Sequence, residues 1–229
     1  MRIHETFSLT LSPVLSDAVF DLDAATQTGG KVADSIAKME FTDMKTKADA
    51  DGVRYFDLTD SFLKRQGGGT LKEDQYYTHA YVMKWRASDS NYRSLLRHSS
   101  DHCAMVAFGS PLLGVYSNRN GHFRKAGYDI VPQQEYWDVV VVTGAGESAT
   151  GPVGVTTFYT MDVTRTMQQR GTADRVCSGM DYYFLGHPKY GPGKISRVVG
   201  WNRVLTIAEI QALPRKLAPF DECKYSRIC

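Results

Sequence analysis

The sequence predicts an all-β protein, namely a two-sheet antiparallel β-sandwich with one short helix near its C-terminus. Two observations predict this class. Short segments with alternating apolar residues or β-branched runs recur along the chain, and glycine, asparagine and aspartate separate them. Only one segment, 207–213, carries the signals of a helix. Many short strands separated by turns pack as two sheets over a shared core.

The N-terminal part is predicted to form short extended segments. Ala18–Asp23 predicts a strand that meets a turn at the glycine pair 29–30. The segment 32–47 leaves two structures open, a short helix or irregular packing, because its apolar residues suit either. Val53–Leu58 alternates again and predicts another strand.

The strongest strand pattern covers Tyr76–Trp85. Large side chains such as Tyr77, Tyr81 and Trp85 share one parity, and smaller side chains occupy the other. Because strand periodicity predicts burial, we expect these three aromatic residues in the core, together with Trp137 and Trp201. Further strands are predicted at Ser94–Arg97, Ala104–Phe108, Leu112–Tyr116, Trp137–Thr143, Gly154–Met161, Asp181–Leu185 and Lys194–Trp201.

The predicted helix has a start signal and a stop signal. Thr206 is suited to be the N-cap, and Glu209 stands at the capping-box position three residues later. Pro214 is expected to end the helix at Leu213. Residues 1–215 are therefore assigned to one domain and residues 216–229 to a packed C-terminal tail.

Composition excludes some partners. The 229 residues are 42% hydrophobic and 23% charged, as in ordinary globular proteins. The net charge of +2 comes from 27 basic and 25 acidic residues without long like-charge runs, which gives no electrostatic case for nucleic acid or an anionic membrane. No apolar stretch approaches the roughly 20 residues that cross a bilayer, so membrane insertion is not expected.

Compartment and cysteine state stay open. The first residues lack the apolar stretch of a secretory signal, so either the protein is not secreted by that route or a leader is missing. No Asn-x-Ser/Thr acceptor occurs. Both an extracellular surface and an intracellular or organellar complex remain as locations. The four cysteines are too few for a disulfide scaffold, although Cys223 and Cys229 could close a small loop, and free thiols are expected in a reducing compartment.

The segment Ile195–Ile210 resembles the closing signature of concanavalin A-like, laminin-G-like jelly rolls. In that family a last strand with an aromatic residue and an Asn-Arg turn runs into a short helix that contains Glu-Ile. Other segments resemble the family in the correct order: Phe20–Asp23, Val32–Ser35, Trp137–Val142, Thr157–Val163 and Tyr183–Gly186. The resemblance covers about residues 15–213. It implies two stacked sheets with adjacent N- and C-terminal strands, but it does not by itself imply a ligand.

A dinucleotide-binding motif is considered and rejected. Gly144–Ala149 follows a β-branched run and matches G-x-G-x-x-A. The motif works only where a helix starts, and here Gly151, Pro152 and Gly154 follow instead. We expect a hairpin loop.

Glycoside hydrolysis is also considered. It needs two carboxylates on either side of the bond, and laminarinase-like members of the superfamily hold them in an E-x-D-x-x-E pattern on one strand face. This chain has no such pattern. Glu135, Glu147 and Asp162 are isolated and are interpreted as solvated loop charges, so the protein is not expected to be an enzyme.

Metal sites receive little support. Calcium occurs in many relatives of the resembled family, and the aspartates Asp49 and Asp51, and likewise Asp57 and Asp60, lie close in sequence. Neither pair resembles an EF-hand. His98 and His102 would suit zinc only on a helix, whereas a polar turn is expected there. No cofactor is predicted, with calcium left open.

Three functions remain, in this order. The first is a non-enzymatic, lectin-like recognition module whose ligand is a glycan or a protein surface. The second is a structural accessory subunit that makes protein–protein contacts in a larger complex or particle, and the third is a glycoside hydrolase. Aromatic side chains stack on sugar faces, and neighbouring polar groups bind the hydroxyls. The loop residues that suit this role are Tyr92, Asn118, Arg119, Asn120, His122, His187 and Tyr190.

Overall fold

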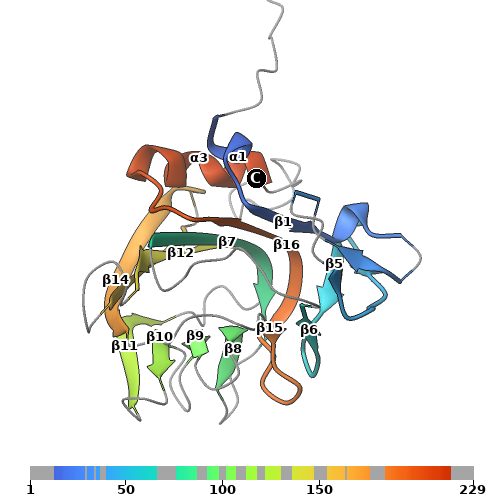
Figure 1. The fold of residues 1–229 in the computed structure, drawn as a ribbon, viewed down its shortest axis with the longest axis horizontal. Coiled ribbons are helices and arrows are strands. Elements are labelled where there is room, and N and C mark those ends of the chain that lie inside the picture. Colours follow the sequence, from blue (N-terminus) through green and yellow to red (C-terminus); the bar gives the residue numbers. More distant parts are fainter. Residues whose placement is uncertain are drawn as a thin grey trace, which may run out of the picture.

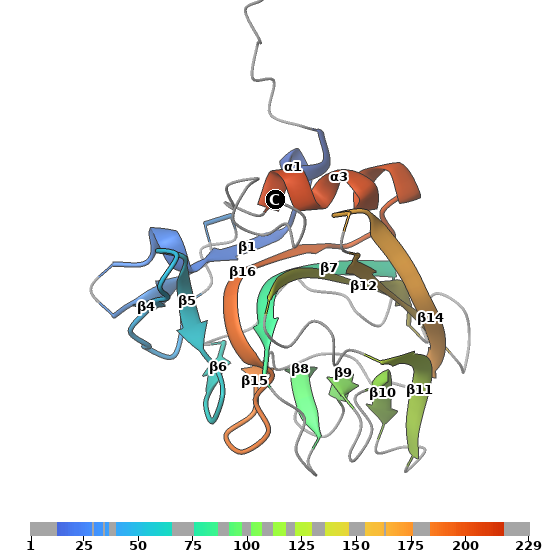
Figure 2. The same ribbon diagram turned by 180° about the vertical axis from the view of Figure 1, so that it is seen from behind.

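In a computed structural model of the chain, the fold is a sandwich of two antiparallel sheets. The structure describes residues 13–28, 30–33, 35–36, 40–65, 76–86, 92–97, 102–106, 112–117, 122–129, 136–146, 154–162, 164–175 and 184–217. Figure 1 and Figure 2 show the two sheets facing each other, with helices α1 (Pro13–Ser16) and α3 (Ile207–Leu217) on the outer side of one of them. This confirms the predicted all-β sandwich with a short C-terminal helix.

The larger sheet has eight strands in the described part of the chain. Their order is β14 (Met167–Arg175), β13 (Gly154–Met161), β12 (Trp137–Ala145), β7 (Tyr76–Trp85), β16 (Gly193–Trp201), β5 (Arg54–Asp57) and β4 (Lys47–Ala48). The eighth strand, β1 (Phe20–Asp23), pairs with β16 in the register Phe20↔Gly200. The first and last strands are thus adjacent, as the family resemblance implied.

The smaller sheet has the order β11 (His122–Asp129), β10 (Leu112–Ser117), β9 (His102–Val106), β8 (Arg93–Arg97), β15 (Phe184–Gly186) and β6 (Phe62–Lys64). The strands β2 (Val32–Ala33) and β3 (Glu40–Phe41) form a separate pair, and a single 3₁₀ turn, η1 (Ala24–Thr26), follows β1.

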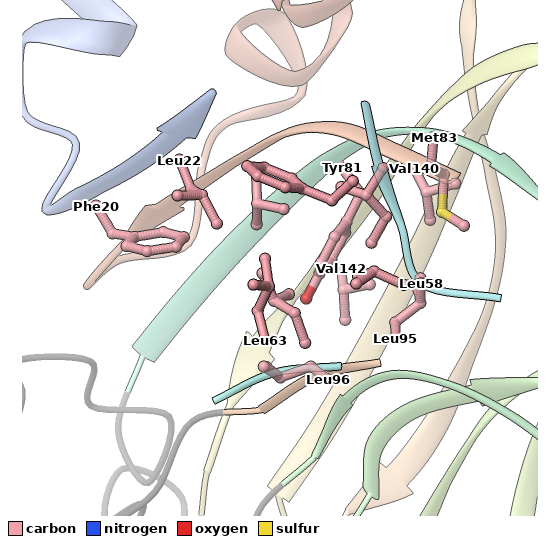
Figure 3. Packing of buried hydrophobic residues seen from close by; sticks show 14 of the residues in the cluster. Phe20, Leu22, Leu58, Leu63, Tyr81, Met83, Leu95, Leu96, Val140 and Val142 are labelled. Atoms are coloured by element: carbon pink, nitrogen blue, oxygen red, sulfur yellow. The ribbon is translucent and has the colours of Figure 1, made fainter. Parts of the chain in front are cut away.

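Two apolar layers hold the sandwich together. Tyr81, Val142 and Leu96 belong to the layer between the sheets, and Figure 3 shows larger-sheet and smaller-sheet side chains meeting there. Val82 and Val141, on the opposite face of the larger sheet, pack in a second layer beneath the helices. Burial of apolar surface on both faces is the main driving force for this arrangement. The aromatic residues Tyr77, Tyr81, Trp85, Trp137 and Trp201 are all buried, as predicted.

The helix α3 starts as predicted and ends later. The amide of Glu209 donates to Thr206 Oγ1 at 3.3 Å, and the amide of Thr206 donates to Glu209 Oε2 at 2.8 Å, which is a capping box. The expectation that Pro214 ends the helix is wrong, because α3 continues to Leu217. Proline removes only one hydrogen bond so near the end, and buried Leu213 and Leu217 hold the last turn against the sheet.

Other expectations also need correction. The described part of 32–47 contains no helix: it contributes the short strands β2, β3 and the start of β4, and residues 42–46 between them have no regular secondary structure, so irregular packing describes only part of the segment. The strands β6, β11 and β14 were not predicted, since the last two are rich in charged and polar residues and lack a clear alternation. They are held by sheet pairing rather than by their own propensity.

Candidate functional site

Three of the seven candidate residues have described side chains, namely Tyr92, His187 and Tyr190. Asn118, Arg119 and Asn120 lie outside the described residues, as do Cys223 and Cys229. The expectation that His122 lies in a loop is wrong, because it begins β11. There it pairs with Ser117 at the end of β10, so this strand extends one residue further than the predicted Leu112–Tyr116.

His187 and Tyr190 stack on each other in the loop between β15 and β16. Their ring centroids are 4.7 Å apart and their planes differ by 29°. The loop turns because Gly186 has a φ of 80°, which glycine adopts without strain. The amide of Lys189 donates to His187 Nδ1 at 3.1 Å and fixes the imidazole ring. Both rings are half-buried, so each keeps an accessible part.

The protonation state of His187 follows from its surroundings. Burial lowers its pKa to about 4, and the positive charges of Arg97 and Lys189 add to this effect. Because Nδ1 accepts from an amide, the neutral ring carries its proton on Nε2. At neutral pH the residue is therefore an uncharged aromatic ring with one donor.

Tyr92 joins the same region from the neighbouring strand. The amide of Ser94 donates to the carbonyl of Tyr190 at 2.8 Å, which holds the 187–190 loop against the start of β8, two residues from Tyr92. The ring of Tyr92 lies 6.4 Å from that of Tyr116 and 6.1 Å from that of Phe123. We name these five half-buried residues the aromatic surface: Tyr92, Tyr116, Phe123, His187 and Tyr190.

A cationic side chain lies beside the aromatic surface. The guanidinium of Arg97, the last residue of β8, lies 5.8 Å above the ring centre of Phe62 on β6. Burial lowers the pKa of Arg97. Sequence reasoning selected neither residue for the site: Arg97 was placed only at the end of the predicted strand Ser94–Arg97, and β6, with three residues, gives no periodic signal.

Three of the four carboxylates considered for calcium accept hydrogen bonds or ion pairs from protein donors. Asp49 accepts the amides of Asp51 and Val53 at 3.0 Å on one oxygen and the indole of Trp137 at 2.7 Å on the other. Asp57 pairs with Lys47 at 2.8 Å, and Asp60 pairs with Arg86 at 2.7 Å. Within the described ranges, no three His, Cys, Asp or Glu side chains gather as a metal site would require.

The other acidic residues give a mixed result. Asp162, interpreted as a solvated loop charge, instead organises the turn between β13 and β14. Its Oδ1 accepts the amides of Thr164 and Thr166 at 2.9 Å, and its Oδ2 accepts Gln168 Nε2. These hydrogen bonds lower its pKa despite the opposing effect of burial. Glu135 and Glu147 lie outside the described residues.

Sequence reasoning also missed Asp138, which is 2% exposed. Burial raises its pKa to about 7, against the opposing effect of backbone amides, Arg170 and Trp85. The signal was present in the sequence, because Asp138 directly precedes the β-branched run 139–143 and shares the parity of Val140 and Val142.

The dinucleotide motif is part of a hairpin, as expected. β12 and β13 pair antiparallel from Val140↔Thr160 to Ala145↔Val155, so Gly144 lies within a strand pair. A Cβ atom at Gly144 would approach the carbonyl oxygen of Val155 to 1.9 Å. Glycine is therefore required there for close strand packing. In the described parts of the chain, no helix has the length and hydropathy of a membrane span.

Solved structures with this fold include enzymes and toxin domains. The sialidase of Trypanosoma rangeli in complex with sialic acid matches with a TM-score of 0.60 and 13% identity, over 88% of this chain and 33% of that one. The binding domain of botulinum neurotoxin DC in complex with SialylT matches with a TM-score of 0.59 and 12% identity, over 90% of this chain and 53% of that one. The binding domain of Paraclostridial Mosquitocidal Protein 1 matches with a TM-score of 0.53 and 11% identity, over 87% and 52%.

These matches define a fold class. The chain has a jelly-roll β-sandwich of two antiparallel sheets, a fold that it shares with parts of these sialidase and toxin structures. It spans about a third of the length of the sialidase chains and about half of the two toxin chains. No protein-family model matches the sequence, and no curated protein is similar to it in sequence.

Proposed function

We propose that this domain is a non-enzymatic recognition module that binds a glycan through the aromatic surface. The observation that carries the proposal is the stack of His187 on Tyr190, held next to Tyr92 by the hydrogen bond from Ser94 to Tyr190. Partly exposed rings in a fixed geometry offer an apolar face at low entropic cost. The resemblance to toxin binding domains supports a binding role for the fold.

The chemistry of the aromatic surface suits a sugar ring. The C–H face of a sugar is apolar and packs on aromatic rings, while its hydroxyl groups need donors and acceptors at the edge. His187 Nε2 and the hydroxyl of Tyr190 supply these groups without a net charge on the imidazole. Arg97 adds a cationic donor at one side of the aromatic surface, within electrostatic range of His187.

The proposed absence of catalysis is supported by the state of two of the acidic groups with described side chains. Asp162 is committed to its turn, and Asp138 is buried in the layer between the sheets. A glycosidase needs two carboxyl groups that reach the substrate from opposite sides. Neither of these two residues is placed to do so.

We also propose that the sandwich is of the laminin-G-like type within its superfamily. The segment that supports this assignment runs from β16 into α3. Trp201 ends the strand, Arg203 lies in the turn, and Thr206 and Glu209 form the capping box.

Glycan-array binding and calorimetry test the proposal. Tyr190→Ala and His187→Ala are each expected to weaken binding about tenfold or more, since central aromatic contacts dominate such interfaces. Tyr76→Ala is the matched control, because Tyr76 is a tyrosine of β7 that is 50% exposed and lies outside the aromatic surface. It is expected to leave binding unchanged.

Two results would contradict the proposal. Turnover of a polysaccharide would show an enzyme. Co-purification in a stable, stoichiometric assembly without any glycan binding would favour the structural accessory subunit instead.

A further inference from the structure

The carboxyl group of Asp138 lies in the apolar interior of the sandwich. Asp138 is the second residue of β12, which runs between β13 and β7 in the larger sheet. It shares its face with Val140 and Val142, which are labelled in the layer between the sheets in Figure 3. A charged carboxylate is costly at such a position, because little water reaches it.

One hydrogen bond links this carboxyl group to the neighbouring strand. The amide of Met161, the last residue of β13, donates to Asp138 Oδ1 at 3.0 Å. The pairing Val140↔Thr160 places these two residues at the same end of the β12–β13 hairpin, where the ladder of backbone hydrogen bonds stops. Asp138 therefore extends the strand pairing with its side chain.

Among the described residues, few charged or titratable groups lie around Asp138. On β14, Arg170 attracts the carboxylate, while Arg170 Nε donates to Thr160 Oγ1 at 2.8 Å. On β7, Met83 is the register partner of Asp138 and Trp85 lies nearby, and His79 is opposite Val142, four residues further along β12. Asp162 follows Met161, but its carboxylate is occupied by its own turn.

These groups do not compensate for burial. Burial raises the pKa of Asp138 to about 7, although the Met161 and Val139 amides, Arg170 and Trp85 all act in the opposite direction. The carboxyl group is therefore protonated in mild acid and becomes charged as the pH rises through neutrality.

We propose that Asp138 is a proton-dependent link between β12 and β13: the neutral carboxyl group holds this corner of the sandwich closed, and the charged carboxylate favours its opening to water. Opening exposes the carboxylate, which removes the cost of burying its charge. The end of β13, the Asp162 turn and the start of β14 are the segments that we expect to move. The domain is thus tighter in mild acid than above neutral pH.

The sign of the effect follows from linkage. The folded-state pKa of Asp138 is above the ordinary value for aspartate, about 3.9. The contribution to stability is therefore fully present below about pH 4 and is lost as the pH rises through 7. Asp162 behaves in the opposite way, because its pKa is lowered in the folded state.

Hydrogen exchange of the Met161 amide, corrected for intrinsic exchange, tests the link in the whole chain. Protection is expected to fall about tenfold between pH 6 and pH 8. Asp138→Asn keeps the size of the side chain and an acceptor for Met161 but cannot ionise, so its protection is expected to stay constant over this range. Asp162→Asn is the control, and protection of the Met161 amide in this variant is expected to fall as in the natural chain.

A second measurement does not depend on a variant folding. Carbon-13 NMR of the Asp138 carboxyl group in the natural chain is expected to show a titration midpoint close to 7. A midpoint below 5 would overturn the proposal. So would an equal fall in protection in Asp138→Asn and in the natural chain.

Discussion

The indole Nε1 of Trp201 donates to the backbone carbonyl of Val14 at 2.7 Å, across 187 positions of sequence. The bond joins the end of β16 to helix α1, and both residues are buried in the layer between the larger sheet and the helices. Together with the pairing of β1 and β16, it fixes the first described segment of the chain onto the last strand. The two ends of the described fold therefore stabilise each other.

Trp201→Phe is expected to destabilise the domain by about 2–4 kcal/mol. The substitution leaves a gap in a fully buried site and removes the only donor that the indole offers to Val14. Chemical denaturation at equilibrium measures the change. Ile207→Ala is the control, since Ile207 is 54% exposed and its loss should cost at most about 0.5 kcal/mol. Equal effects of the two substitutions would contradict the role given to Trp201.

The start of α3 gives a prediction about acid stability. Glu209 accepts both Arg203 and the Thr206 amide, and these bonds, the one from Arg203 first, lower the pKa of Glu209 to about 2. The contribution of Glu209 to the stability of the fold is present above about pH 4 and is lost as the pH falls through 2. In Glu209→Gln, stability at pH 7 is expected to drop, whereas near pH 2 the variant and the natural chain should unfold at similar temperatures. Parallel melting curves over the pH range would contradict this.

The sequence predicted the parts of the fold whose signal is local. Tyr76–Trp85 shows alternation over ten residues, and Thr206 with Glu209 is a capping box, so both were found with correct starting points. The polar strands β11 and β14 were missed, because they lack a local alternation and are held by tertiary pairing with β10 and β13. The continuation of α3 through Pro214 was missed for the same reason, since burial of Leu217 is tertiary information.

The candidate site was predicted only in part. His187 and Tyr190 are three residues apart in a loop, so proximity was foreseeable, but their stacking depends on the turn at Gly186. Contact of Tyr92 with Tyr116 and Phe123 depends on how β8, β10 and β11 are arranged in the smaller sheet, which no local pattern shows.

Gly144→Ala tests the assignment of the G-x-G-x-x-A segment to a hairpin. The added Cβ would lie 1.9 Å from the Val155 carbonyl oxygen, so β12 and β13 must separate locally. We expect a loss of about 2–3 kcal/mol in a denaturation experiment, in the range of other overpacking substitutions. Gly52→Ala is the control, because nothing lies within 4 Å of a Cβ there, and only its φ of 79° carries a cost of about 1 kcal/mol.

His187 gives a prediction that joins the electrostatics of the aromatic surface to binding. Its pKa is lowered to about 4 by burial and by the charges of Arg97 and Lys189, so the ring is neutral throughout the range from pH 5 to 8. A proton NMR titration of the His187 ring is expected to have its midpoint near 4 in the folded chain and near 6.5 in urea. The contribution of His187 to stability is present above about pH 6.5 and is lost as the pH falls through 4.

The lowered pKa of His187 also predicts the pH dependence of glycan binding. We expect the affinity to be constant from pH 5 to 8 and to fall below about pH 4, where a charged imidazole would be repelled by Arg97 and Lys189. His187→Phe keeps an aromatic ring against Tyr190 but loses the acceptor for the Lys189 amide. We therefore expect this variant to bind more weakly at neutral pH and to lose the fall in affinity near pH 4. A natural chain whose glycan affinity changes between pH 6 and 7 would contradict the neutral state assigned to His187.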